Sequence, residues 1–350
     1  MRAAVTRGGS SLAVERVARP EPGPGEVRVR VTACGICGSD LHLLRAGFMA
    51  PGHTPGHEMA GRVDALGSGV RGLREGQAVA VEPFRSCGSC ALCAAGRDPL
   101  CREARLLGVH APGGLAEYVV APARRLFPAP DDLAAPLAAL AEPLAVSVHG
   151  LRRGALVAGE RVVVLGAGSV GLLTLLAARA LGAGETWITA RHAHQAEVAR
   201  QLGAARVLAE GEAPAPGDEA DLVVETVGGG ADTLAEAAAW VRPAGRVVVL
   251  GVFLAPVVLQ TLPLLMKEAS LLWSYCYQHP ADDSAHRPLA VRGKGRLETA
   301  DFADALAILD RERERAARVA SHAVPLDEVE RAFALASRRK EGALKVSVLP

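Results

Sequence analysis

Residues 161–171 read RVVVLGAGSVG, an apolar run that leads into closely spaced glycines. The apolar residues predict a buried strand, and the apolar pattern that follows Gly171 predicts a helix. Glycines at these positions permit a tight turn and a close approach to the backbone, while the N-terminus of the helix favours a phosphate group. We therefore expect this loop to hold the pyrophosphate of a dinucleotide. Its predicted binding residues are Gly166, Gly168, Ser169, Val170 and Gly171.

Apolar strands continue to alternate with amphipathic helices along this part of the chain. TWITA (186–190) precedes the helical pattern HQAEVARQLGA (194–204), and ADLVVETVG (220–228) precedes a further helix. Buried strands that alternate with helices of this length are typical of βαβ units. The pattern predicts an α/β fold with a doubly wound parallel sheet, the Rossmann arrangement.

The first 150 residues have a different texture, with many glycines and prolines between short strand-like runs. This pattern predicts an irregular β-rich domain similar to a barrel. After about residue 290 the chain is mixed again, with helical stretches and a closing strand. The predicted division is a β-rich domain over residues 1–152, a nucleotide-binding domain over 153–290, and a return to the first domain over 291–350.

Composition and charge exclude several classes of protein. Half of the 350 residues are hydrophobic and the formal net charge is +1, so neither disorder nor attraction to nucleic acid or an anionic membrane is expected. The N-terminus lacks the apolar run of a signal peptide, and the most membrane-like run, residues 162–178, is slightly short for a transmembrane helix. We expect a soluble cytoplasmic protein. In that setting its seven cysteines favour a metal or catalysis over disulfides.

One short loop, CGSCALCAAGRDPLC, carries four of these cysteines. Four thiolates within fifteen residues can surround a single tetrahedral ion. An iron–sulfur cluster has similar spacings, and four buried free cysteines are a further alternative. We favour a closed structural zinc site, which would stiffen the loop and perform no chemistry. Its predicted ligands are Cys87, Cys90, Cys93 and Cys101.

A second set of metal-ligating residues is spread over three stretches: CGICGSDLH (34–42), PGHEMAG (55–61) and LAEPLAVSVHG (140–150). Each has an ordinary explanation, since Cys34 and Cys37 could form a redox pair, His57 could be a core histidine and Glu142 an exposed charge. However, Glu142 lies among apolar residues, where an unpaired carboxylate is costly and a metal is a natural partner. A catalytic zinc needs about three protein ligands and an open position.

Together these stretches, with VVVLGAGSVG and the closing HAVPLDEVERAFALASRRKEGALKV, resemble the zinc-dependent medium-chain alcohol and polyol dehydrogenases over nearly the whole chain. The resemblance implies a GroES-like catalytic domain beside the Rossmann domain, two zinc ions per chain, and a homodimer or homotetramer. It also implies a small-molecule alcohol or carbonyl substrate, with EPL at Glu142 favouring polyols, sugars or cyclitols, and secondary alcohols still open.

The resemblance further assigns roles around the catalytic zinc. Cys37 and His57 are implied ligands, and Glu58 and Glu142 are implied as the carboxylates near the ion. Either of the two carboxylates could bind the zinc directly. Zinc would lower the pKa of a bound alcohol, while Ser39 would take the hydroxyl proton and pass it through the cofactor ribose toward His42. His42 could instead be a plain surface residue.

The choice of nicotinamide cofactor depends on the end of the second strand of the nucleotide-binding domain. An acidic residue there would bond the adenosine ribose of NAD, but WITARHAHQ (187–195) places Ala190, Arg191 and His192 at that point. A neutral residue followed by Arg leaves room for a 2′-phosphate and supplies a bidentate partner. We therefore predict NADP, with NAD as a possible alternative if Arg191 is only solvated.

Other functions remain as alternatives: an NAD-dependent polyol dehydrogenase, a catalytically silent NADP-binding sensor, and a zinc protein that binds nucleic acid. The near-neutral charge opposes the last of these. A zinc-free quinone reductase of the same fold would lack Cys37, His57 and the four-cysteine loop.

Overall fold

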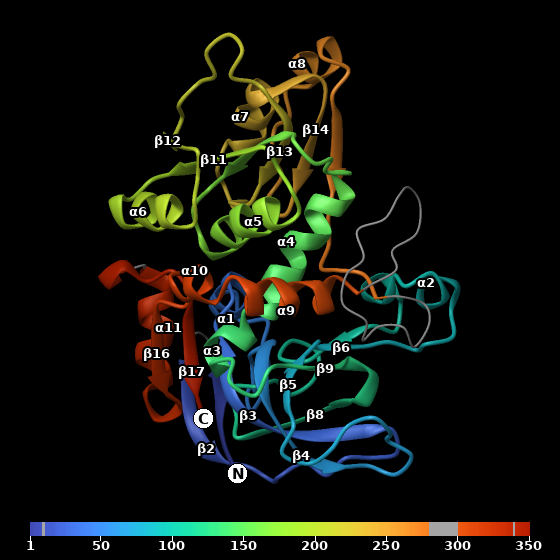
Figure 1. Ribbon diagram of the computed structural model, residues 1–350. Coiled ribbons are helices and arrows are strands. Elements are labelled where there is room, and N and C mark those ends of the chain that lie inside the picture. The colour runs from blue at the N-terminus through green and yellow to red at the C-terminus, as the bar shows by residue number, and fades with distance from the viewer. Residues whose placement is uncertain (9–10, 280–299, 339) are drawn as a thin grey trace. The chain divides into compact units, whose positions relative to one another are not determined.

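A computed structural model describes residues 1–8, 11–279, 300–338 and 340–350. The chain forms two compact units (Figure 1). Unit 1 comprises Met1–Glu142, Gln278–Arg313 and Ala320–Pro350, and unit 2 comprises Pro143–Tyr277 and Glu314–Val319. The division expected at residues 152 and 153 falls in helix α4 (Ala141–Arg153), and the one expected at 290 and 291 lies outside the described residues.

Helix α4 belongs almost wholly to unit 2, where one glycine in the helix and one just after it allow close packing. A Cβ on Gly150 would lie 2.8 Å from a methyl of Leu250, and a Cβ on Gly154, just beyond the helix, would lie 2.7 Å from a methyl of Leu222. This close packing places the change of unit near the start of α4.

Unit 2 contains a six-stranded parallel sheet in the order β12-β11-β10-β13-β14-β15. The strand order reverses between β10 and β13, so the sheet is doubly wound, as predicted. Helices α5 and α6 pack on β10, β11 and β12, and α7 packs mainly on β13 and β14. The strands are β10 (Arg161–Leu165), β11 (Glu185–Ala190), β12 (Arg206–Ala209), β13 (Ala220–Glu225), β14 (Val241–Val249) and β15 (Ser270–Trp273). The helices that follow α4 are α5 (Ser169–Ala180), α6 (Ala193–Gln201), α7 (Thr233–Trp240), α8 (Thr261–Met266) and, at the end of unit 2, α10 (Arg313–Ala317).

Unit 1 is β-rich, and most of its strands join one sheet in the order β16-β17-β3-β4-β5-β9, with β8 also paired to β3. The closing strand β17 lies between β16 and β3, so the C-terminal segment completes the sheet that the N-terminal residues begin. Fully buried side chains such as Val29, Val79 and Leu126 form its core. The strands of this sheet are β3 (Glu26–Gly35), β4 (Glu58–Leu66), β5 (Ala78–Val81), β8 (Tyr118–Pro122), β9 (Leu126–Pro128), β16 (His322–Pro325) and β17 (Val346–Leu349).

Two small hairpins and several short helices complete unit 1. The hairpins pair β1 with β2 and β6 with β7. Among the described residues, none of the helices combines the length and apolarity that crossing a bilayer requires. The remaining strands and α-helices are β1 (Arg2–Gly8), β2 (Ser11–Arg16), β6 (Phe84–Arg85), β7 (Arg105–Leu106), α1 (Gly38–Arg45), α2 (Ala91–Ala94), α3 (Ala135–Ala139), α9 (Asp301–Arg311) and α11 (Val329–Arg338).

Candidate active site

Cys37, His57 and Glu58 lie together in unit 1, with their ligand atoms all within 4.8 Å of one another. Cys37 directly precedes α1, while His57 and Glu58 stand at the start of β4. Pairing of β3 with β4 brings the two segments together by placing Gly35 opposite Glu58. A Cβ at Gly35 would lie 2.1 Å from a carboxylate oxygen of Glu58, so only glycine leaves room for this side chain.

The imidazole of His57 is oriented by two neighbours. Its Nδ1 lies 3.3 Å from Asp40 Oδ1, and its Nε2 lies 3.5 Å from Ser39 Oγ. The other oxygen of Asp40 accepts the Cys37 N–H at 2.9 Å. Burial disfavours a charged imidazole, but the charges of Asp40 and Cys37 outweigh it and raise the pKa of His57. A carboxylate at Nδ1 leaves Nε2 as the atom that can bind a metal.

Lys345 belongs to the immediate surroundings of this cluster, and the sequence did not point to it. Its ammonium lies 2.6 and 2.7 Å from the two carboxylate oxygens of Glu58 and 3.2 Å from the carbonyl of Ile36. Burial alone would lower the pKa of Lys345, but the charge of Glu58 outweighs it and raises the pKa. One signal in the sequence could have indicated it. The chain has only four lysines, and Lys345 stands directly before the apolar closing strand.

The donor set of this cluster fits zinc. A thiolate, an imidazole and a carboxylate are ligands found at catalytic zinc sites. The thiol of Cys37 and the carboxyls of Asp40 and Glu58 can carry more negative charge here than Lys345 balances, so a divalent cation is a natural partner. Cys34, in contrast, is fully buried, and burial raises its pKa well above the usual value, so it stays a thiol.

Two further predicted residues lie at the margin of the cluster. Glu142, in the first turn of α4, is buried and contributes to the raised pKa of Lys345, but the metal-ligating cluster of described residues does not include it. His42 is exposed on α1, three positions after Ser39. Residues three apart share a helix face, so His42 lies on the Ser39 side of α1 and reaches solvent.

The four cysteines of the predicted structural site converge around one point. Their Sγ atoms are separated by 3.8 Å between Cys87 and Cys93 and by 3.5 Å between Cys101 and Cys87, and Cys90 lies 3.6 Å from Cys93. A tetrahedral ion with Zn–S bonds of about 2.3 Å places its sulfurs about 3.8 Å apart. Peptide N–H groups lower the pKa of Cys87 to about 6, while burial raises the pKa of Cys93 to about 12. A bound cation is therefore needed to hold all four as thiolates.

A buried ion-pair network anchors this cysteine loop. The guanidinium of Arg125, which is fully buried, donates to Glu82 and to Asp98, and Asp98 lies between Cys93 and Cys101 in sequence. Ser86, next to Cys87, donates to Asp98 at 2.5 Å. The loop is thus held in place by charged groups as well as by its cysteines.

In unit 2, the glycine loop has the geometry that phosphate binding requires. Gly166 adopts a φ of +99°, which only glycine readily adopts. A Cβ on Gly171 would lie 1.7 Å from the carbonyl oxygen of Gly166, so this close packing also depends on glycine. Gly168 precedes α5, and nothing lies within 4 Å of its Cβ position. The N-terminus of α5 is therefore open to an anion.

Arg191 stands just after β11, whose last residue is Ala190, and His192 caps the N-terminus of α6. The Arg191 guanidinium forms a bidentate ion pair with Glu210, with an Nε–Oε2 distance of 2.7 Å. Sequence reasoning did not include Glu210. The structure thus places a cation where it was predicted and adds an anionic partner.

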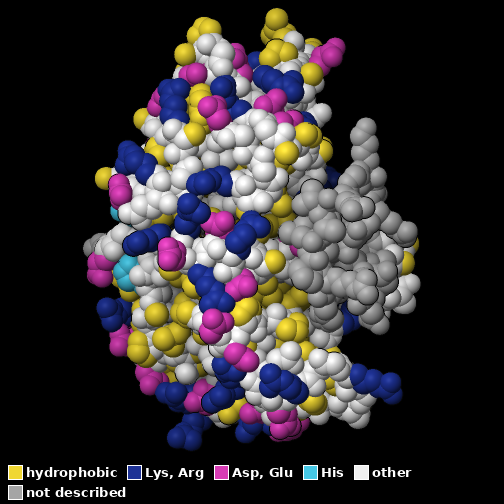
Figure 2. All heavy atoms as spheres, viewed as in Figure 1, with side chains coloured by type: hydrophobic (Ala, Val, Ile, Leu, Met, Phe, Trp, Pro, Cys, Tyr) yellow, Lys and Arg dark blue, Asp and Glu magenta, His cyan; other side chains and the backbone are white. Residues whose placement is uncertain are grey.

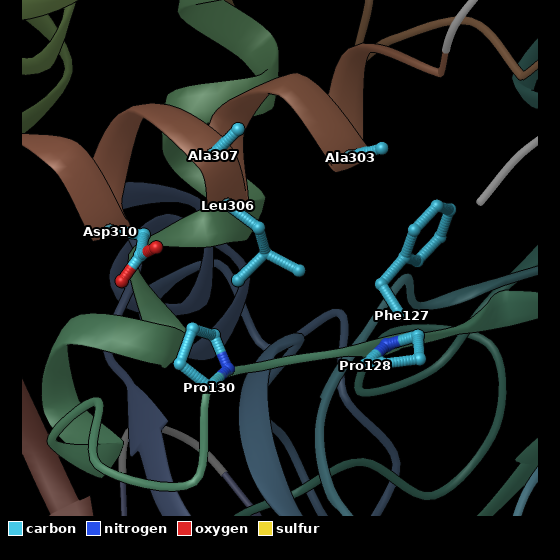
Figure 3. Close-up of a pocket in the computed structure, with 7 residues that line it drawn as sticks. All are labelled: Phe127, Pro128, Pro130, Ala303, Leu306, Ala307 and Asp310. Carbon is cyan, nitrogen blue, oxygen red and sulfur yellow. The ribbon is translucent and has the colours of Figure 1, made fainter. Parts of the chain in front are cut away.

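A separate hollow of about 250 Å³ lies between β9 and α9 (Figure 3). Its lining is apolar, with Pro128, Pro130 and Leu306, except for Asp310, which accepts a hydrogen bond from Arg313 at 2.9 Å. This hollow lacks the donor groups of the metal cluster. Figure 2 shows positive and negative side chains interspersed over the visible face, without a continuous basic stripe.

Two family models match the chain. The alcohol dehydrogenase GroES-like domain matches residues 23–131, and the zinc-binding dehydrogenase domain matches residues 169–288. Among curated proteins, L-threonine 3-dehydrogenase of Pyrococcus horikoshii is 32% identical over 289 residues, which are 78% of this chain and 82% of that protein.

Solved structures match the whole fold. A putative zinc-binding dehydrogenase from Sinorhizobium meliloti 1021, bound to NADP, has 32% identity and a TM-score of 0.84 over 100% of this chain and 99% of that one. The dehydrogenase RspB from E. coli CFT073, complexed with NADH, has 27% identity and a TM-score of 0.87 over the same shares. Relatives of this chain therefore hold either nicotinamide cofactor.

Proposed function

Because the chain belongs to the zinc-dependent medium-chain dehydrogenases, which use NAD(P), we propose that it transfers a hydride between a secondary alcohol and NADP. Polyols, sugars and cyclitols are the proposed substrate class, together with simpler secondary alcohols. The observation that carries the proposal is the convergence of Cys37, His57 and Glu58. The relative named L-threonine 3-dehydrogenase also supports it, because the 3-hydroxyl of threonine is a secondary alcohol.

When zinc and the nicotinamide cofactor are bound, zinc supplies Lewis acidity at the alcohol oxygen and the nicotinamide accepts the hydride. Cys37 and His57 would hold the ion, and Asp40 keeps the imidazole turned with Nε2 toward it. The hydroxyl of Ser39, 3.5 Å from His57 Nε2, accepts the alcohol proton while it releases its own toward His42. His42, exposed on the same face of α1, passes that proton to solvent.

The two carboxylates have different proposed tasks. Glu58 is the third protein ligand, since a carboxylate has about four lone-pair sites and can accept from Lys345 while it binds a metal. Glu142 acts through a water molecule, because it is outside the cluster of ligand atoms. The four-cysteine loop would hold the second, structural zinc.

The proposed preference for NADP depends on Arg191 and on the absence of a carboxylate at Ala190. We expect the wild-type protein to have the higher kcat/KM with NADP, and Ala190→Asp/Arg191→Ile to reverse the preference toward NAD. A strong wild-type preference for NAD would refute this assignment.

The proposed assembly is a homodimer or homotetramer, paired through unit 2. Strand β15 pairs only with β14 among the described strands, so one edge of the sheet is open. Trp273 of β15 is strongly exposed, and so are five apolar side chains in the segment of the chain between β14 and β15: Leu254, Val258, Leu262, Leu265 and Met266. Light scattering should show a multimer for the wild-type protein and a smaller species for Val258→Asp, and a monomeric wild-type protein would refute the assembly.

The substrate proposal is tested by incubating the zinc-loaded protein with polyols, sugars, cyclitols, simple secondary alcohols and L-threonine, each with NADP or NAD. Formation of reduced nicotinamide, followed by its near-ultraviolet absorbance, identifies the substrate class. Turnover with secondary but not primary alcohols is expected. Turnover of primary alcohols alone would contradict the proposed class.

A further inference from the structure

Glu210 occupies a position from which it can act on a bound cofactor. It directly follows β12, and the register of β11 and β12 pairs Ala190 with Ala209. Glu210 and Arg191 are therefore neighbours at the carboxyl edge of the parallel sheet, which is where open α/β sheets bind their ligands.

The ion pair between these two residues is exposed and easily opened. The side chain of Arg191 is 59% exposed and that of Glu210 is 51% exposed. Nε and Nη2 of Arg191 both donate to the Glu210 carboxylate. Exposed pairs of this kind contribute little to stability, so a competing anion can displace Glu210. Hydrogen bonding from Arg191, with the nearby His192, lowers the pKa of Glu210, which is therefore negative at neutral pH.

A 2′-phosphate would meet this carboxylate as a competitor. The phosphate carries about −1.5 to −2 charges at neutral pH and would use the same donor atoms of Arg191 that Glu210 uses. Displaced from the guanidinium, the Glu210 carboxylate remains nearby and repels the phosphate. A ribose with a free 2′-hydroxyl needs neither the donors of Arg191 nor the removal of Glu210.

We propose that Glu210 is a specificity-determining residue that selectively weakens binding of the 2′-phosphorylated cofactor. It thereby reduces the difference in affinity between NADP and NAD. This proposal rests on the proposed contact of Arg191 with the 2′-phosphate. Arg191 provides the attraction and Glu210 limits it.

The test measures binding of 2′,5′-ADP and 5′-AMP to the full chain by calorimetry, which is independent of turnover. The phosphate carries nearly two negative charges, and a carboxylate close to it opposes its binding even through water. Glu210→Gln is therefore expected to tighten 2′,5′-ADP about tenfold and to change 5′-AMP by less than about twofold. Glu197→Gln is the matched control, because Glu197 is an exposed carboxylate of α6 that pairs with Arg200 at 3.6 Å. It should change neither ligand.

Four other results would overturn a proposal, and each is distinguishable. Unchanged binding of 2′,5′-ADP to Glu210→Gln, or equal tightening of both ligands, overturns the role of Glu210. Weaker binding of 5′-AMP to Glu210→Gln also overturns it, since Glu210 would then bond the ribose. If Arg191→Gln binds 2′,5′-ADP as well as the wild-type protein does, the proposed NADP contact itself fails.

Discussion

Replacing Lys345 by Met should destabilise unit 1 by about 3–5 kcal/mol. Methionine keeps most of the apolar volume of the lysine stem but removes its ammonium. In the native structure that ammonium lies 2.6 and 2.7 Å from the oxygens of Glu58, and the side chains of Lys345 and Glu58 are only 2% and 1% exposed. The variant therefore leaves a carboxylate buried without the cation that compensates it.

Two comparisons distinguish loss of this ion pair from a nonspecific loss of packing. The first is the double variant Glu58→Gln/Lys345→Met, which also removes the uncompensated charge and should therefore recover a large part of the stability lost in Lys345→Met. Zinc at the cluster would partly neutralise Glu58, and the effect of Lys345→Met should therefore be larger after metal removal.

Urea denaturation followed by circular dichroism measures the change. Tryptophan fluorescence serves as an internal control, because Trp187, Trp240 and Trp273 all belong to unit 2. Lys345→Met should shift the dichroism transition to lower urea more than the fluorescence transition. An unchanged midpoint, or a double variant that is no more stable than the single one, would show that Lys345 does not compensate the charge of Glu58.

Further substitutions test the remaining parts of the account. Ser39→Ala should lower kcat by about 10²-fold or more with unchanged nucleotide affinity, and Ser39→Thr should restore turnover; steady-state kinetics of both variants measure this. Cys90→Ser should lose one zinc per chain and melt at a lower temperature. The control variant Cys276→Ser, outside the cysteine loop, should keep all its zinc. An unchanged melting curve for Cys90→Ser would count against the structural site. Burial opposes ionisation of Asp98, but the charge of Arg125 outweighs burial and lowers the pKa of Asp98. The stability that Asp98 provides is therefore present above about pH 4 and is lost as the pH falls further. Asp98→Asn should consequently be less stable at pH 7 and lose less stability on acidification, as acid-dependent urea denaturation would show.

The nucleotide-binding unit was predictable because its signals are local. A strand, a glycine turn and a helix follow one another within residues 161–180, and Gly166 and Gly171 each have a separate steric reason in the structure. The four cysteines were predictable for the same reason, since a loop of fifteen residues supplies every ligand. In both cases the chain brings its functional groups together without long-range pairing.

The parts that the sequence left open depend on contacts between distant residues. Lys345 is 287 positions from Glu58, and only the pairing of β17 with β3 and of β3 with β4 brings them together. Glu210 meets Arg191 through the register of two parallel strands, which no spacing in the sequence records. The helix α4 likewise joins unit 2 through packing at Gly150, which the composition of the segment does not reveal.

The zinc content per chain of the wild-type protein and of Cys37→Ser shows whether Cys37 holds a catalytic metal. We expect two zinc ions in the wild-type protein and one in Cys37→Ser, with turnover abolished and nucleotide binding retained in the variant. A variant that keeps both ions and turns over substrate at the wild-type rate would contradict the claim that the Cys37–His57–Glu58 cluster is the catalytic metal centre.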